Sequence, residues 1–304
     1  MQAIVYYLAF PLLYFISILP FPILYLLSDF CYFLVYRVVG YRKKVVRLNL
    51  TRSFPEKSHS EIIEIEKKFY RNLTDIILET LKCISTTPKD INNCVTLGNF
   101  EVVEKYKREN KNIIITGGHC GNYEFVCQFV GLSYSSNVFP LTPIAVYRKL
   151  ANPRFEKLFF KFRTKFGSIL YPTEESYKAI NNQDTHRPFA YFLINDQSAI
   201  PERAYFTTFL NQETTFFKGS EMYARKYDMP VVYMSILRKG RGKYHLTFEV
   251  IADEPAKTKE GEILEKHARL LEKDIIKDPA NWLWSHKRWK YKMVDGEYQG
   301  VNYH

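Results

Sequence analysis

The sequence predicts an α/β protein in which helices flank a mixed β-sheet, with an apolar membrane-anchoring helix at the N-terminus. Two observations carry this prediction. The first 28 residues contain no Asp, Glu, Lys or Arg. From residue 112 onward, short runs rich in β-branched and aromatic residues alternate with helix-length amphipathic segments. Strands that alternate with helices are typical of an α/β sandwich.

The composition limits the classes of protein to which the chain can belong. Of its 304 residues, 46% are hydrophobic and 16% aromatic, which excludes a disordered or collagen-like polymer. The net charge of +11 favours an anionic partner such as nucleic acid, anionic lipid or a phosphorylated small molecule. The five cysteines form no C-x-x-C pair, so we expect neither a disulfide framework nor a structural zinc site.

The uncharged N-terminal stretch is long enough to cross a hydrocarbon core, which takes about 20 residues. We expect it to span the membrane, although Pro20 and Pro22 favour a kink or a break and leave an interfacial arrangement open. A second apolar stretch, residues 30–39, is followed by a basic flank that predicts a cytoplasmic location for what comes next. We therefore assign residues 1–36 to a membrane anchor and 37–304 to one α/β domain. The basic flank consists of Arg37, Arg42, Lys43, Lys44 and Arg47.

Local signals place the elements of the α/β domain. Ser58 and Glu61 fit a capping box, and apolar residues at helical spacing follow, so residues 60–84 are expected to form an amphipathic helix that Pro88 ends. The expected strands are 113–116, 189–194, 231–237 and 244–251, and the other expected helices are 151–166, 216–227 and 261–276.

The first of these strands leads into a glycine-rich turn that carries a histidine. His119 lies between Gly118 and Gly121, and Glu124 follows at the start of a predicted helix. If the turn bends back, Glu124 reaches the imidazole, holds one ring nitrogen protonated and leaves the other free to accept a proton. The alternative is a turn histidine that the glutamate caps for structural reasons alone.

Several segments together carry a resemblance to a known family. The run from Gly118 to Glu124 resembles the G-H-x-G-N-W/Y-E form of the H-x4-D/E motif of the bacterial late lipid A acyltransferases, within the lysophospholipid acyltransferase superfamily. Four further segments also resemble this family, so the resemblance covers nearly the whole chain. They are Tyr147-Arg148 with Asn152-Pro153 and Arg163, then Asn195-Asp196-Gln197, then 216–225, and the tryptophan-rich block 281–290.

The resemblance implies a glycerolipid acyltransferase-like fold and transfer of a fatty acyl chain to a hydroxyl of a lipid A precursor or related glycolipid. The implied donor is a thioester of acyl carrier protein or coenzyme A, and the implied location is the cytoplasmic side of the cell inner membrane. The implied catalytic residues are His119 as base, Glu124 as its orienter and Arg148 as an anion clamp. The implied substrate-binding residues are Arg163, Asn122, Asp196 and Gln197. We expect contacts with membrane lipids and no metal, organic cofactor or nucleic acid.

Some alternatives stay open at this stage. Cys120, beside His119, suits a thiol nucleophile, although adjacent side chains usually point apart. The acceptor could instead be a lysophospholipid or an aminolipid, or the protein could be a non-enzymatic membrane-anchored binder of anionic lipids. In the 281–290 block, Trp282, His286 and Trp289 lie at helical spacing, which predicts a helix packed on the core. Departures from the family pattern at 198–203 and 208–211 bear on the acceptor and the acyl length.

Overall fold

The computed structural model describes residues 2–181, 187–294 and 297–301. Met1, the first residue of the predicted anchor, lies outside them. The helices are α1(Gln2–Ile18), α2(Phe21–Tyr32), α3(Lys43–Ser53), α4(His59–Lys82), α5(Pro88–Cys94), α6(Glu101–Arg108), α7(Tyr123–Ser135), α8(Pro153–Thr164), α9(Ser176–Asn181), α10(Gly219–Tyr227) and α11(Glu262–Lys277). The strands are β1(Val95–Leu97), β2(Ile113–Gly117), β3(Thr142–Tyr147), β4(Ile169–Pro172), β5(Phe189–Ile194), β6(Ala204–Phe209), β7(Gln212–Phe217), β8(Val231–Gly240), β9(Lys243–Ala252), β10(Tyr291–Val294) and β11(Glu297–Gly300).

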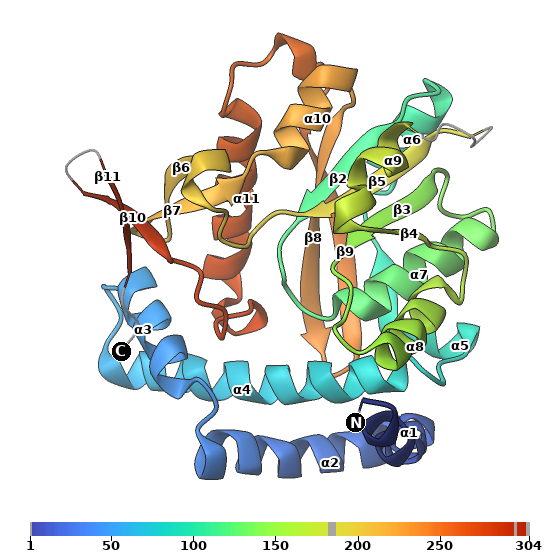
Figure 1. The fold of residues 1–304 in the computed structure, drawn as a ribbon, viewed down its shortest axis with the longest axis vertical. Helices are drawn as coiled ribbons and strands as arrows, with labels where there is room; N and C mark the ends of the chain where they lie inside the picture. The colour runs from blue at the N-terminus through green and yellow to red at the C-terminus, as the bar shows by residue number, and fades with distance from the viewer. Residues whose placement is uncertain (1, 182–186, 295–296, 302–304) are drawn as a thin grey trace.

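A seven-stranded mixed sheet organises the fold, in the order β1-β9-β8-β2-β5-β3-β4 (Figure 1). Strands β8, β2, β5, β3 and β4 are mutually parallel, and β9 runs antiparallel to β8. The predicted α/β fold with a mixed sheet is therefore confirmed, and most of the sheet is parallel. The carboxyl ends of the five parallel strands lie at one edge of the sheet, where ligand sites of α/β proteins usually form.

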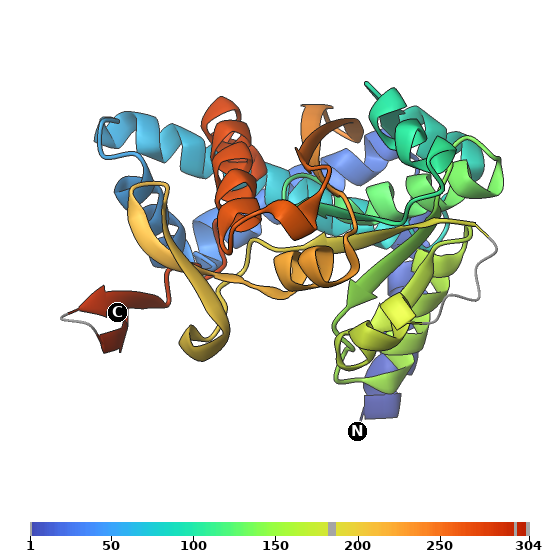
Figure 2. The same cartoon turned by 90° about the horizontal axis from the view of Figure 1, so that it is seen from above.

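The expected strands 113–116, 189–194, 231–237 and 244–251 are confirmed as β2, β5, β8 and β9. The expected helices 151–166 and 261–276 are confirmed as α8 and α11. The expected helix 216–227 begins only at Gly219, because the preceding residues end β7, which forms an antiparallel hairpin with β6. Figure 2 shows this hairpin projecting from the side of the sheet core.

Helix α4 crosses below the sheet and is the longest helix of the described chain (Figure 1). Its N-terminus carries the predicted capping box: Ser58 Oγ accepts from the backbone N–H of Glu61, and the Glu61 carboxylate accepts from the backbone N–H of Ser58. The chain then turns at residues 83–87, and Pro88 begins α5 rather than continuing α4. The strongly apolar side of α4 faces both the core and the functional cavity described below.

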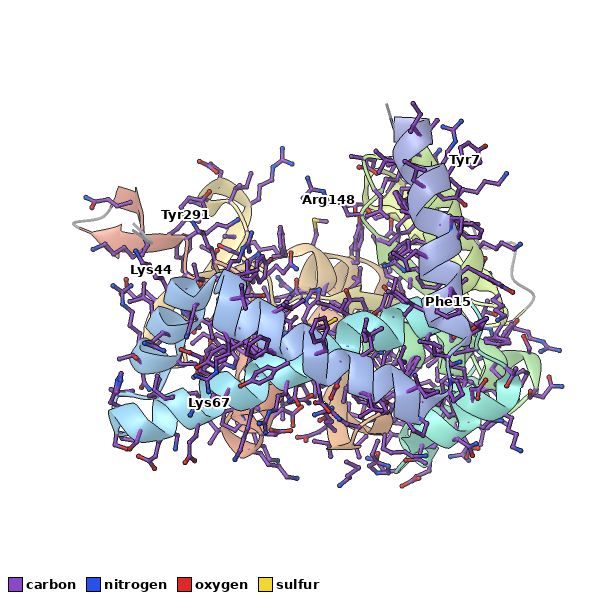
Figure 3. All side chains as sticks on the ribbon, turned by 90° about the horizontal axis from the view of Figure 1, so that it is seen from below. Tyr7, Phe15, Lys44, Lys67, Arg148 and Tyr291 are labelled. Atoms are coloured by element: carbon purple, nitrogen blue, oxygen red, sulfur yellow. The ribbon has the colours of Figure 1, made fainter. Side chains whose placement is uncertain are left out.

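The N-terminal segment forms two helices, and the expected break lies between Ile18 and Phe21, at Pro20, whereas Pro22 lies in the first turn of α2. Helix α2 continues as a π-helical turn, η1(Phe33–Val39), and the run Phe21–Val39 is long and apolar enough to cross a membrane. Only 17% of its apolar window is buried inside the protein. Helix α2 runs alongside α4, and Figure 3 shows α1 turning away from the line of α2 on the same lower face.

The prediction of a helix in the 281–290 block is wrong. After a short 3-10 turn, Pro279–Asn281, the chain follows an irregular path to β10. The expected packing on the core is nevertheless confirmed, since Trp282, Trp284 and Trp289 are at most 3% exposed. Their indole rings pack on one another with centroid separations of 4.8 to 6.4 Å, and this mutual packing fixes the segment without a helical backbone.

Candidate active site

The histidine-bearing turn joins β2 to α7 at the carboxyl edge of the sheet. Two glycines give it its shape. A Cβ on Gly118 would lie 2.5 Å from the Leu271 side chain, and Gly121 has a φ of +56° with the Tyr244 ring 2.9 Å from its Cβ position. Because a side chain at either position would clash, the glycines let the backbone pass close to α11 and β9 and present His119 at the edge.

The imidazole of His119 is held by Asp196, which follows the neighbouring strand β5. Asp196 Oδ1 lies 2.5 Å from His119 Nδ1. Asp196 Oδ2 accepts hydrogen bonds from the backbone N–H of His119 at 2.7 Å and from Trp282 Nε1 at 2.8 Å. The carboxylate therefore places the proton on Nδ1 and leaves Nε2 as the nitrogen available to accept a proton.

Electrostatics within this pair favour the charged forms of both groups. Burial lowers the pKa of His119, but the charge and hydrogen bond of Asp196 raise it more, so the pKa lies above the ordinary value of 6.5. Burial likewise raises the pKa of Asp196, but interactions with His119 and the Trp282 N–H bring it well below its ordinary value. Asp196 is thus an anion at neutral pH, next to a histidine poised to take up a proton.

The predicted contact between Glu124 and His119 is wrong. Both Glu124 oxygens are engaged by Arg163 of α8, with Arg163 Nε 2.8 Å from Oε2 and Nη2 2.5 Å from Oε1. Helix α7 starts at Tyr123, and its first turn directs Glu124 toward α8 rather than back toward the imidazole. The fork of the guanidinium matches the carboxylate in a two-point ion pair that is 4% exposed on the glutamate side.

A largely apolar cavity of about 320 Å³ opens beside His119. One wall is a face of α4, and the opposite wall comes from the histidine-bearing turn, α8 and the tryptophan-rich segment. The α4 residues that line it are the apolar Phe69, Leu73, Ile76, Ile77 and Leu81 and the polar Asn72 and Thr80. Ile77 is 48% exposed, so the cavity opens to the surface along α4. A base at the mouth of an apolar cavity suits a substrate that has both a reactive polar group and a hydrocarbon chain.

Comparison with known proteins now decides between the classes of enzyme that such a site allows. The sequence model of one family, the bacterial lipid A biosynthesis acyltransferases, matches residues 1–291. The chain belongs to this family. No curated protein shows a significant similarity to the chain. Family membership makes the protein an acyltransferase, and a purely lipid-binding, non-enzymatic function is not retained.

Other predicted site residues of this lipid A acyltransferase family member lie at the same edge of the sheet. Gln197 Nε2 is 3.4 Å from His119 Nε2, so its amide faces the ring nitrogen that Asp196 leaves free. Arg148 follows β3 and is exposed, with no ion pair among the described residues. Arg163, predicted to bind substrate, is paired with Glu124, and the rings of Tyr147 and Phe159 lie beneath its guanidinium. The roles of Arg148 and Gln197 stay predictions.

Asn122 is placed differently from its predicted role in substrate binding. It is 0% exposed and caps α7, where its Oδ1 accepts from the backbone N–H groups of Glu124 and Phe125. Its Nδ2 donates to Glu79 of α4. Because its side chain is buried and both amide atoms form hydrogen bonds within the protein, Asn122 stabilises the histidine-bearing turn rather than contacting substrate.

Sequence reasoning named Asp196 only as part of the substrate-binding wall and missed its contact with His119. The signal that could have found it is topological: Asn195 and Asp196 follow a predicted buried strand, just as the histidine turn does, and neighbouring parallel strands end at the same edge. Trp282 gave no such signal, because its bond to Asp196 depends on the irregular path after η5(Pro279–Asn281). Among the described residues, no three His, Cys, Asp or Glu side chains form a group that could hold a metal ion.

Proposed function

We propose that the protein transfers a fatty acyl chain from an acyl thioester, carried by acyl carrier protein or coenzyme A, to a hydroxyl of a lipid A precursor or related glycolipid. The observation that carries the proposal is the His119–Asp196 pair at the mouth of an apolar cavity, in a chain of this family. The cavity accommodates a hydrocarbon chain, and the base serves the hydroxyl that receives it.

In the proposed reaction His119 Nε2 takes the proton of the acceptor hydroxyl as its oxygen attacks the thioester carbonyl. The C–S bond then breaks as the tetrahedral intermediate collapses, and the proton on the imidazole goes to the departing thiolate. Asp196 stabilises the imidazolium that forms between these two proton transfers. Arg148, which is exposed and has no ion pair among the described residues, is the proposed partner for negative charge on the substrate, whereas the charge of Arg163 is paired with Glu124.

The proposed location is the cytoplasmic face of the inner membrane. Support comes from α1, α2 and η1, whose outward side chains include Leu8, Leu26 and Val39 with exposed fractions of 70% or more. A contiguous apolar surface of this kind is typical of a membrane contact. Lys44 and Lys67, labelled in Figure 3, lie on the same lower face, where cations would meet anionic headgroups.

The first test replaces the base. His119→Ala is expected to lower acyl transfer by about 100- to 10,000-fold, the usual contribution of a general base. The measurement is turnover with radiolabelled acyl donors and separate lipid A precursor, lysophospholipid and aminolipid acceptors, because this comparison also identifies the acceptor class. Near-normal turnover by a folded His119→Ala protein would refute the assignment of the base.

A further inference from the structure

A second cavity, of about 510 Å³, lies between α2, α4 and the turn that joins β8 to β9. Its walls are charged, whereas those of the cavity at His119 are mostly apolar. Four cationic side chains and two acidic ones line it: Lys68, Arg71, Arg238, Arg241, Asp29 and Asp75. The cavity therefore has two more positive than negative charges.

The positive charges are only partly neutralised inside the protein. Arg238 Nη2 pairs with Asp75 at 2.6 Å, and Arg241 bridges Asp75 and Asp29. Lys68 and Arg71 are both exposed and have no ion pair among the described residues. These two cations, which form no ion pair among the described residues, thus belong to the open side of the cavity, where a ligand can reach them.

Buried polar atoms add to this cationic surface. Arg238 is 13% exposed in its side chain, and its Nε is buried without a hydrogen-bond partner. The Arg71 guanidinium lies 5.2 Å from the centroid of the Tyr32 ring, which holds it beside the cavity. Guanidinium groups are the side chains best matched to phosphate oxygens, so the chemistry of this cavity favours a phosphate-bearing ligand.

The position of the cavity indicates where the phosphate comes from. Asp29 and Tyr32 of α2 line it, while Leu26 and Phe30, on the neighbouring face of the same helix, are 70% and 57% exposed. The cavity therefore opens beside an exposed apolar strip. A phospholipid has this same pairing of a phosphate with hydrocarbon chains.

The cavity is separate from the catalytic one. At 100° per residue, Lys68, Arg71 and Asp75 occupy one face of α4, and Phe69, Leu73 and Ile76 occupy the adjacent face that lines the cavity at His119. Asn72 lies on the boundary and lines both. We propose that the charged cavity binds the phosphate headgroup of an anionic membrane phospholipid that is not a substrate, and so fixes how the enzyme sits on the bilayer.

The test compares the full-length protein with the double variant Lys68→Gln/Arg71→Gln. Both side chains are exposed, so the fold should survive, and a thermal melt checks this. Binding is measured by co-sedimentation with vesicles of phosphatidylcholine, with or without phosphatidylglycerol. We expect the variant to bind the phosphatidylglycerol vesicles about tenfold more weakly or worse, and the pure phosphatidylcholine vesicles as well as the unchanged protein does.

The matched control is Lys107→Gln/Arg108→Gln, which removes the same two charges from the exposed end of α6. We expect this variant to keep its binding to phosphatidylglycerol vesicles. Equal losses in the two double variants would show general electrostatic attraction and overturn the proposed site.

Two further arms separate the sources of phosphate. Inorganic phosphate, added at the same concentration as the lipid phosphate of the vesicles, should not displace the protein from them. Effective displacement would overturn the lipid assignment in favour of a free anion. Unchanged vesicle binding by Lys68→Gln/Arg71→Gln, together with a raised KM for the glycolipid acceptor, would instead assign the cavity to the substrate. Because vesicle binding is measured without acyl transfer, its outcome does not depend on the proposed reaction.

Discussion

At the residue scale, the site depends on which carboxylate fixes the histidine. Glu124 is five residues from His119 in the chain but faces α8, whereas Asp196 is 77 residues away and directly follows the next strand of the sheet, β5. A parallel sheet brings the ends of separate strands together, so the distant residue makes the contact. The local H-x4-E spacing instead provides a buried glutamate–arginine pair beside the site.

The pH dependence of the reaction tests the role of Asp196. A general base must be neutral, so kcat/KM should rise as pH increases through the pKa of His119, which Asp196 holds above 6.5. In Asp196→Asn the raising interaction is lost and burial lowers the pKa, so this limb should move to lower pH. The maximal rate should fall by at least about tenfold, because the imidazolium loses its counter-charge.

The shift is measured in a pH–rate profile of purified Asp196→Asn, and a thermal melt checks that the variant is folded. A purely structural role for Asp196 would lower the rate at every pH and leave the limb in place. The double variant with His119→Ala should be little worse than His119→Ala alone, since residues that act as one unit give non-additive losses.

Cys120 allows a separate test of direct transfer. Its side chain is 5% exposed, and burial raises the pKa of the thiol well above 9.0, so the thiolate needed for nucleophilic attack is disfavoured. Cys120→Ser should therefore keep most of the wild-type turnover. Intact mass spectrometry of wild-type protein given donor alone should show no acyl adduct, and an acyl-cysteine that passes into product on addition of acceptor would reverse this conclusion.

At the element scale, one buried carboxylate connects four parts of the chain. Glu79 of α4 is 0% exposed. Its Oε1 accepts from Tyr25 Oη at 2.9 Å and from the backbone N–H of Gly242 at 3.0 Å. Its Oε2 accepts from Tyr244 Oη at 2.7 Å and from Asn122 Nδ2 at 3.0 Å. The apolar helix α2, the β8–β9 turn and the histidine-bearing turn are thus joined through α4.

Glu79→Gln should be destabilising, although the side chain keeps its size. The amide has only one acceptor oxygen, so its NH₂ group would face at least one of the four donors and leave it unsatisfied. The expected loss in free energy of unfolding is about 1–3 kcal/mol, with a smaller fall in activity through Asn122.

The free energy of unfolding is measured by chemical denaturation. The control is Glu64→Gln, an exposed position on the same helix, which is expected to lie within about 0.5 kcal/mol of wild type. Equal stability of the two variants would contradict this account of Glu79.

The elements that the sequence predicted well have their signals in local chemistry. The capping box at Ser58 favours the start of α4, and the β-branched run at 113–116 favours β2. Both are short-range effects, so they do not depend on the order of the strands in the sheet. The 282–290 segment shows the limit of this reasoning. Its aromatic residues have the spacing of one face of a helix, but in the structure they pack on one another and on Phe209 without a helical backbone. No local sequence pattern distinguishes these two arrangements.

In the candidate site, too, the local features were predictable and the long-range contacts were not. The turn around His119 is local, and it forms where expected. The partners of His119 and Glu124 depend on which strands and helices become neighbours, and this order is fixed by the packing of the whole sheet. The partner Arg163 was recognised as a site residue but not as the ligand of Glu124, because α8 is placed beside α7 only in the folded chain.

At the scale of the whole molecule, the arrangement of α1 and α2 bears on how the protein meets the membrane. Tyr25 and Ser28 of α2 bond to Glu79 and Asp75 of α4, so the two helices run side by side in opposite directions. Were α2 to cross the bilayer, the charged side of α4 would enter the hydrocarbon with it, at roughly 2.5–3.5 kcal/mol for each charged residue near the centre. Both α1 and α2 lie along the lower face of the molecule (Figures 1 and 3), which favours an arrangement parallel to the membrane surface over the spanning helix that length alone predicts.

Spin labels along α2 distinguish the two arrangements. Ile23, Phe30 and Val38 are 49%, 57% and 64% exposed, and each is changed to Cys in a protein whose Cys31 and Cys127 are replaced by Ser. In a helix parallel to the surface, all three labels should lie at the same shallow depth, as measured by collisions with oxygen and with a water-soluble relaxation agent in vesicles. In a spanning helix the first and last labels are separated by about 22 Å along the axis, so the middle label would be far deeper than the other two.

A label at Lys107, on the exposed end of α6, is the aqueous control. A deep middle label between two shallow ones would show that α2 crosses the bilayer and that its packing on α4 is not kept in the membrane.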